Sequence, residues 1–119
     1  MGVIPYSPLA AGFLTGKYRR GEQAPKSARA TSVANRYGDS ERAWQTLDAV
    51  VDVGTARGRT PAQVALAWLL AQPTITAPII GSNNVNQLEE LLGAVGFQLS
   101  RQEMKRLDTA SGGSFEWND

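Results

Sequence analysis

The sequence has no cysteine and no histidine among its 119 residues. Without cysteine, the chain can form neither a disulfide nor a reactive thiolate. Without histidine, it lacks the commonest metal ligand and the side chain that ordinarily exchanges a proton near neutral pH. The composition therefore argues against a metal centre and against a hydrolase that uses a Ser-His-Asp triad.

Long hydrophobic runs are also missing. No stretch reaches the roughly 20 apolar residues that a membrane-spanning helix needs, and the first residues lack the charged region and cleavage site of a signal peptide. We therefore expect no membrane partner and a cytoplasmic location. A hydrophobic content of 42% is sufficient for a core, and the length fits a single domain that spans residues 1–119.

Acidic residues are scarce between positions 17 and 36, where Glu22 is the only one. Half of the chain's 12 lysines and arginines lie in the same segment, although the formal net charge is only +1. The ordinary explanation is a solvated basic loop, and the alternative is a site that meets an anion. No nucleic-acid partner is predicted, because neither a recognition helix nor interleaved aromatic residues accompany the segment. The basic residues are Lys17, Arg19, Arg20, Lys26, Arg29 and Arg36.

The first forty residues combine a short apolar run with a long irregular segment. Gly2 to Tyr6 has the composition of a short buried strand in a parallel sheet. From Ser7 to Gly38 no helical or alternating period persists, so we expect a loop of about thirty residues. Ordered loops of that length usually bind ligands or cover a site.

Helix signals are clearer in the rest of the chain. Ser40 is placed to cap a helix that stops at Gly58, and Thr60, Pro61 and Gln63 form a capping-box start with proline at the first helical position. The helix that follows Thr60 is apolar on nearly every face, so it must be covered on several sides. The remaining predicted elements are a strand at Pro78 to Ile80, a helix capped by Asn84, and a helix from the Ser100 capping box through Ser111.

The order of these elements implies an α/β fold with parallel strands and helical crossovers. In such folds, ligands bind at the C-terminal ends of the strands. Two loops follow the two strands, at Ser7 to Lys17 and at Gly81 to Asn84. The second loop leads into a helix N-terminus, whose free N–H groups and positive dipole end attract anions. Together the loops predict a phosphorylated ligand, while each alone is explained by ordinary turn and capping chemistry.

Four sequence blocks together resemble the C-terminal part of the aldo-keto reductase family. They are YSPLAAGFLTGKY, TPAQVALAWLL, PIIGSNNVNQLEELLGA and LSRQEMKRLD, in that order, and they cover nearly the whole chain. The resemblance implies part of a (β/α)8 TIM barrel, namely the last two βα units and the cap helix, with two short parallel strands and about four helices. It also implies a nicotinamide dinucleotide, usually NADPH, bound in extended form at the C-terminal rim.

The resemblance assigns cofactor-binding roles to residues of both loops. Tyr6 matches the aromatic side chain that stacks on the nicotinamide ring, and Lys17 and Arg29 match a basic clamp on the phosphates. Gly12 matches a position where the backbone approaches the ligand closely. The positions that match the pyrophosphate lining are Ser7, Pro8, Leu9, Ala10 and Ala11, and those that match the adenosine end are Gly81, Asn83, Gln87 and Glu90.

Three positions depart from the family pattern. Leu91 stands where many relatives have asparagine. Gly81 and Gln87 stand where some branches use lysine and arginine to hold the 2′-phosphate. NADP(H) is therefore an expectation from the family, and NAD(H) stays open as the cofactor.

The family's catalytic Asp, Tyr, Lys and His match no position of this chain. They belong to earlier strands, so the resemblance predicts a segment with no catalytic residue and negligible reductase activity by itself, since general acid catalysis typically contributes about 10²- to 10⁴-fold. Two strands alone leave exposed edges, so we expect the chain to associate with itself or with a complementary barrel half. Two alternatives remain open: a non-enzymatic partial-barrel module, and a split enzyme whose catalytic residues come from a separate chain.

Overall fold

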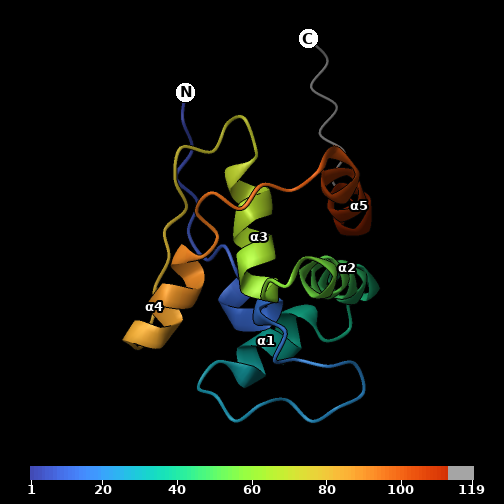
Figure 1. The fold of residues 1–119 in the computed structure, drawn as a ribbon. Helices are drawn as coiled ribbons and strands as arrows, with labels where there is room; N and C mark the ends of the chain where they lie inside the picture. The colour runs from blue at the N-terminus through green and yellow to red at the C-terminus, as the bar shows by residue number, and fades with distance from the viewer. Residues whose placement is uncertain (113–119) are drawn as a thin grey trace.

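Helices form most of the regular structure of the chain. The computed structural model describes residues 1–112, which Figure 1 colours along the chain. Within these residues no helix is long and apolar enough to cross a membrane. The elements are a short 3-10 helix, η1 (Ala10–Thr15), followed by α1 (Ala30–Tyr37), α2 (Glu41–Arg57), α3 (Pro61–Leu70), α4 (Val85–Leu92) and α5 (Arg101–Ser111).

Four predicted helix starts are confirmed by their capping hydrogen bonds. The side chains of Ser40, Thr60, Asn84 and Ser100 each accept a hydrogen bond from a backbone N–H three residues further on. At Thr60 and Ser100 the reciprocal bond of a capping box is also present. The predicted stop of α2 is confirmed as well, because Gly58 takes a left-handed conformation with φ of 64°.

Helix α3 lies at the centre of the molecule, with α2 and α5 on one side and α4 on the other (Figure 1). One cluster of buried side chains joins α2, α3 and α5 and includes Phe97. A second cluster joins α3 to α4 through Leu66 and Leu91. These contacts confirm that the apolar α3 is covered on several sides. Its buried residues are Ala62, Val64, Ala65, Leu66 and Ala67.

A third, largely aromatic cluster fixes the segment that we expected to be irregular. The Phe13 ring lies 5.9 Å from that of Tyr18, 5.1 Å from that of Tyr37 and 5.1 Å from that of Trp44, measured between centroids. The expectation of a loop without helix from Ser7 to Gly38 was therefore wrong, since η1 and α1 lie inside it. Both are too short to show a period, and packing on the Phe13 ring stabilises them.

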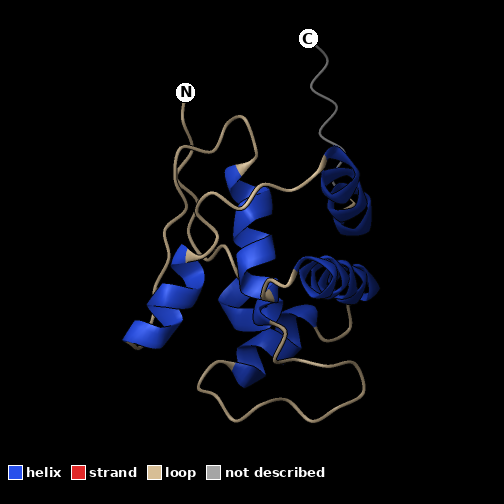
Figure 2. Ribbon diagram, in the orientation of Figure 1, coloured by secondary structure: helices blue, strands red, loops and turns tan. Residues whose placement is uncertain are grey.

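The two predicted strands are not confirmed as strands. Within residues 1–112 the backbone forms one isolated parallel bridge, between Val3 and Ile75, and Figure 2 accordingly shows helices and loops there. Two short segments without further neighbours are marginal as a sheet, which accounts for the difference. The backbone hydrogen bonds between them run from Val3 N to Thr74 O (2.9 Å), from Thr76 N to Val3 O (2.9 Å) and from Ile79 N to Pro5 O (2.8 Å).

Candidate functional site

The first candidate loop has an unusual backbone. Ser7, Ala10 and Ala11 have φ angles of 52°, 52° and 57°, and Gly12 follows with 98°. Positive φ is costly for residues other than glycine, and such strain concentrates at functional sites. The hydroxyl of Thr15 donates to the carbonyl oxygen of Gly12 at 2.7 Å and closes the turn. Consecutive turn conformations of this kind create concave backbone surfaces that receive anions.

Lys17 lies against this turn. A Cβ atom added at Gly12 would stand 3.3 Å from Cε and 3.4 Å from Nζ of Lys17, so the glycine leaves room for the lysine side chain. Gly16 has φ of 84°, and a Cβ atom added there would stand 2.7 Å from Cγ of Pro61. The loop is therefore seated closely on the start of α3, with the Lys17 ammonium beside its left-handed residues.

The two predicted loops begin next to each other. Leu9 and Ile80 pack against the same cluster between α3 and α4. The segments that carry them run side by side in Figure 1 and are joined by the bond from Ile79 N to Pro5 O. Tyr6, at the end of the first segment, is 81% exposed, so its ring belongs to no core cluster and is open to a ligand. Pro8 and Leu9, at the start of the turn, are half-buried.

The second loop is closed by side-chain amides. The backbone N–H of Asn83 donates to Oε1 of Gln87 at 2.8 Å, and the backbone N–H of Gln87 donates to Oδ1 of Asn84 at 2.9 Å. The structure thus brings Asn83 and Gln87 together at the start of α4. Among residues 1–112, no atom outside its own chain neighbours lies within 4 Å of a Cβ atom added at Gly81, so this glycine has open space around it there.

Glu90 and Leu91 are placed by the contact between α3 and α4. The carbonyl oxygen of Glu90 accepts a hydrogen bond from Nε2 of Gln63 at 2.8 Å. Leu91, the position that departs from the family pattern, is buried in the cluster between the two helices. It therefore acts as a core residue, and an asparagine there would have to bury a polar amide.

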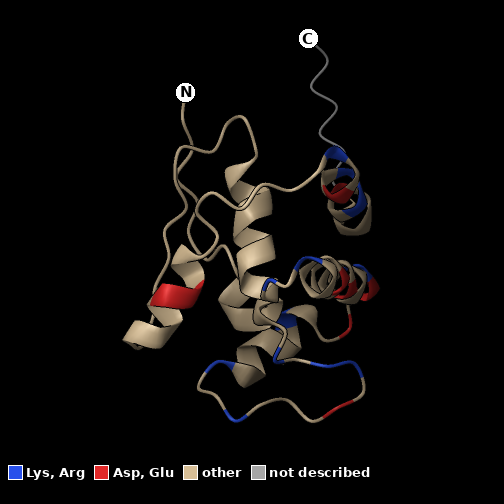
Figure 3. Cartoon of the chain, viewed as in Figure 1, with Lys and Arg blue, Asp and Glu red and all other residues tan. Residues whose placement is uncertain are grey.

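The basic residues between positions 17 and 36 do not act as one group. Nη1 of Arg20 lies 2.6 Å from Oε2 of Glu41, Nη2 lies 3.6 Å from Oδ2 of Asp48, and the guanidinium covers the Trp44 ring at 5.8 Å. The hydrogen bond from Arg20 holds the pKa of Glu41 below its usual value. Arg29 instead stands exposed at the N-cap of α1. Figure 3 shows the basic residues spread along this loop and acidic residues on α2.

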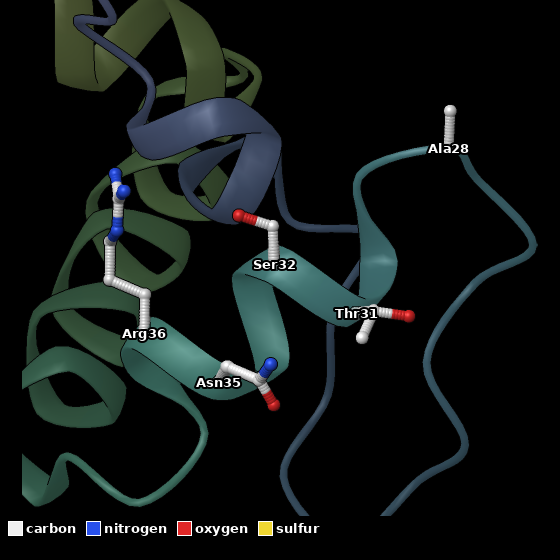
Figure 4. A pocket seen from close by; sticks show the side chains of 5 residues that line it. All are labelled: Ala28, Thr31, Ser32, Asn35 and Arg36. Carbon is white, nitrogen blue, oxygen red and sulfur yellow. The ribbon is translucent and has the colours of Figure 1, made fainter.

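Sequence reasoning missed a shallow hollow of about 650 Å³ on the exposed side of α1. Figure 4 shows that Thr31 and Asn35 project to a different side of the helix from Ser32 and Arg36, so these polar groups do not converge. The sequence signal for this hollow is the pair of polar residues on each side of Val33, namely Thr31 and Ser32 before it and Asn35 and Arg36 after it. This signal becomes informative only once α1 is known to be a helix. None of the predicted cofactor residues lines the hollow. Its lining residues are Ala28, Thr31, Ser32, Asn35 and Arg36.

A solved structure shares the fold. The glycerol dehydrogenase AKR11B4 from Gluconobacter oxydans superimposes with a TM-score of 0.71 at 25% sequence identity, over 92% of this chain and 33% of the dehydrogenase. The chain therefore has the fold of about a third of a dehydrogenase, which is an oxidoreductase.

Sequence comparison gives the family itself. The model of the aldo/keto reductase family matches residues 1–111, so the chain belongs to that family. An uncharacterized oxidoreductase, YrpG of Bacillus subtilis, is 39% identical over 91% of this chain and 31% of its own length. The NADP(+) aldo-keto reductase yakc of Schizosaccharomyces pombe is 37% identical over 91% of this chain and 32% of its own length. The L-glyceraldehyde 3-phosphate reductase of Escherichia coli K12 is 32% identical over 91% of this chain and 33% of its own length. The chain spans about a third of the length of these curated relatives.

Proposed function

We propose that this chain is the cofactor-binding segment of an NAD(P)H-dependent aldo-keto reductase, corresponding to the last part of the (β/α)8 barrel. In this proposal the two loops hold one dinucleotide between them. The chain contains no residue that matches the family's catalytic set, so it binds the cofactor without reducing a carbonyl compound by itself.

The observation that carries the proposal is that the two loops pack against the same hydrophobic cluster. Leu9 and Ile80 rest on one cluster, which places the turn after Ser7 and the loop after Gly81 at the same end of the paired segments. A ligand with a phosphate group at its middle and a base at one end can span two such loops. The Lys17 ammonium beside the left-handed turn supplies the positive charge that a pyrophosphate requires.

The proposed roles follow from the chemistry of each group. The exposed Tyr6 ring stacks on the nicotinamide, and the backbone from Ser7 to Ala11 together with Lys17 and Arg29 binds the phosphates. Around the adenosine, Asn83 and Gln87 offer amide groups and Glu90 offers a carboxylate to the adenine amino group. A bound nicotinamide supplies hydride transfer, and the residues of the two loops hold its ring in position.

A fluorescence titration with NADPH, with NADH as comparison, tests the proposal. We expect saturable binding of NADPH that the Arg29→Ala variant weakens by about tenfold or more, because a charge-assisted contact with a phosphate is lost. Arg101→Ala is the matched control, since Arg101 is an exposed arginine at the start of α5, away from both loops. No binding up to about 1 mM nucleotide, which corresponds to roughly 4 kcal/mol, would show that the loops are not a working site in this chain.

A second candidate function is a partial-barrel module that acts by association and not by binding a nucleotide. The observation in its favour is the number of large apolar side chains left exposed around the paired segments and α4, including Val3, Ile4 and Ile79. Such a module would bind a second copy or a complementary barrel half. Association without affinity for either nucleotide in the same titration would favour this function over the first.

A further inference from the structure

The segment from Lys17 to Arg20 joins the left-handed turn to the exposed basic loop, and its side chains contact two different elements. Lys17 lies against Gly12 of the turn. Tyr18 is only 5% exposed and belongs to the aromatic cluster that also contains side chains of α2. Arg20 contacts α2 as well, through ion pairs and a ring. The backbone that carries Lys17 is therefore attached to α2 by two side chains that follow it.

Three groups of α2 hold the Arg20 guanidinium. Nη1 lies 2.6 Å from Oε2 of Glu41, Nη2 lies 3.6 Å from Oδ2 of Asp48, and the guanidinium carbon lies 5.8 Å from the centre of the Trp44 ring. The side chain of Arg20 is 48% exposed. One ion pair at such an exposed place contributes little to stability, but several charges in a network, together with a ring under the guanidinium, contribute jointly.

Arg20 is also the connection between the basic loop and the helices. Within residues 1–112, it is the residue from Arg19 to Arg29 whose side chain forms an ion pair or a hydrogen bond with a helix. Arg19 donates to the carbonyl oxygen of its neighbour Tyr18 at 3.4 Å. The loop extends away from the helices in Figure 1. Without the contacts of Arg20, motion of this loop would pass directly to Tyr18.

The hydroxyl of Tyr18 favours release of the segment from α2. In the described part of the chain its oxygen is buried and has no hydrogen-bond partner. Burying a hydroxyl without a partner costs free energy, and this cost is recovered if the ring moves out to water. The contact of the ring with Phe13, at 5.9 Å between centroids, opposes the release. Arg20 opposes it as well, because it binds the same helix two residues further on.

We propose that Arg20 is a positioning residue for Lys17. Its contacts with Glu41 and Asp48 hold the segment from Lys17 to Arg20 against α2, and they thereby keep the Lys17 ammonium beside the left-handed turn. The consequence for nucleotide binding rests on the function proposed above. The attachment of the segment to α2 does not rest on it, so the two are tested separately.

Arg106 offers a matched control on the same helix. Its Nη2 lies 2.5 Å from Oδ2 of Asp52 on α2, and the two side chains are 52% and 58% exposed. Arg106 belongs to α5. The Arg106→Gln variant therefore loses a similarly exposed ion pair with α2 while the contacts of Arg20 remain.

Digestion with chymotrypsin tests the attachment without any nucleotide. The protease takes an aromatic side chain into its specificity pocket, so cleavage after Tyr18 requires that the ring leave the cluster, and its rate reports how often the segment is released. Cleavage after the exposed Tyr6 is the internal reference. The Glu41→Gln, Asp48→Asn variant removes both carboxylates and leaves the cleaved sequence unchanged. We expect it to raise the relative rate about fivefold, and Arg106→Gln to leave the rate unchanged.

The Tyr18→Phe variant should have the opposite effect. It removes the hydroxyl that has no partner and keeps a ring that chymotrypsin accepts, so cleavage at this position should be slower than in the wild type. Equal cleavage rates in the wild type and in the Glu41→Gln, Asp48→Asn variant would show that Arg20 does not hold the segment, and would overturn the proposal.

A double-mutant cycle of NADPH binding tests the link to Lys17. We expect Arg20→Gln to raise the dissociation constant about threefold, and Arg20→Lys to restore part of the affinity because it keeps a charge opposite the two carboxylates. In a Lys17→Gln background, Arg20→Gln should have no further effect, since Arg20 acts through Lys17. Equal effects in both backgrounds would mean that Arg20 acts independently of Lys17, which contradicts a positioning role.

The two experiments separate this inference from the proposed function. A wild-type chain that binds neither NADPH nor NADH would overturn the proposed function, and with it any role of Arg20 in nucleotide binding. The cleavage rates after Tyr18 would still decide whether Arg20 holds the segment against α2.

Discussion

Gly16 is the residue on which the seating of the first loop depends most directly. It has φ of 84° and lies close to Pro61. A Cβ atom added at Gly16 would stand 2.7 Å from Cγ of the proline. We expect Gly16→Ala to lower the free energy of unfolding by about 2 kcal/mol, from backbone strain and overpacking together. Urea denaturation measures the change.

Variants of two other glycines separate the backbone strain from the steric clash that Gly16→Ala combines. Gly58 has φ of 64°, and an added Cβ atom would meet nothing within 4 Å in the described part of the chain, so Gly58→Ala should cost about 1 kcal/mol from strain alone. Gly81 has neither constraint, so Gly81→Ala should change the stability by less than about 0.5 kcal/mol. Equal costs at Gly16 and Gly58 would mean that the contact of η1 with Pro61 is not a tight one.

At the same scale, Thr60 caps the central helix. Its hydroxyl oxygen accepts from the backbone N–H of Gln63 at 3.3 Å, and Oε1 of Gln63 accepts from the backbone N–H of Thr60 at 3.1 Å. Thr60→Ala should cost about 1 kcal/mol and lower the melting temperature by several degrees. Thr60→Ser keeps the acceptor and should retain most of the stability, and calorimetry compares the two variants.

At the scale of elements, we expect the contact of α5 with α2 to depend on pH. Burial raises the pKa of Glu103, but the backbone N–H of Ser100 at 2.7 Å and the Arg57 guanidinium at 2.7 Å lower it more, so the net pKa lies below its usual 4.5. A carboxylate with a lowered pKa in the folded state stabilises the protein at neutral pH. That stabilisation is lost as the pH falls through 4.5 toward the folded-state value.

The Glu103→Gln variant isolates this effect. We expect it to lose about 0.5 to 1 kcal/mol at pH 7, because the ion pair with Arg57 is gone. Its stability should also fall less than that of the wild type between about pH 5 and pH 3. Urea midpoints at several pH values measure both, with Glu22→Gln in the exposed loop as the control. Parallel acid profiles for wild type and Glu103→Gln would contradict the assignment.

The elements that the sequence predicted correctly are those whose signals are local. Ser40, Thr60, Asn84 and Ser100 act within one helical turn, so their neighbours in sequence suffice to place α2 to α5. Helix α1 was missed because it depends on packing with Phe13, far outside its own turn. The strands were predicted from apolar composition, but a strand requires partners that a short sequence run does not reveal.

The residues of the candidate site divide in the same way, into those that the local sequence predicts and those that depend on contacts between distant segments. The turn residues around Gly12 and the Asn84 cap follow from residue type, and the family resemblance supplied the rest of the set. The pairing of Arg20 with Glu41 could not be predicted, since these residues are separated in the chain and meet only when α2 packs beside the loop. The contact of Lys17 with Gly12 likewise depends on the left-handed turn between them.

At the scale of the whole molecule, the isolated bridge between Val3 and Ile75 has a kinetic consequence. Its two hydrogen bonds close a loop of about seventy residues, and closing that loop costs entropy. The side chains at the bridge offset this cost only weakly, because some of them, such as Val3, remain exposed to water. The N-terminal segment can therefore detach while α2 and α3 stay folded. In native-state hydrogen exchange the amides of Val3 and Thr76 should lose their protons quickly by this local opening, whereas the amides of Val64 and Leu66 should exchange only when the whole chain unfolds.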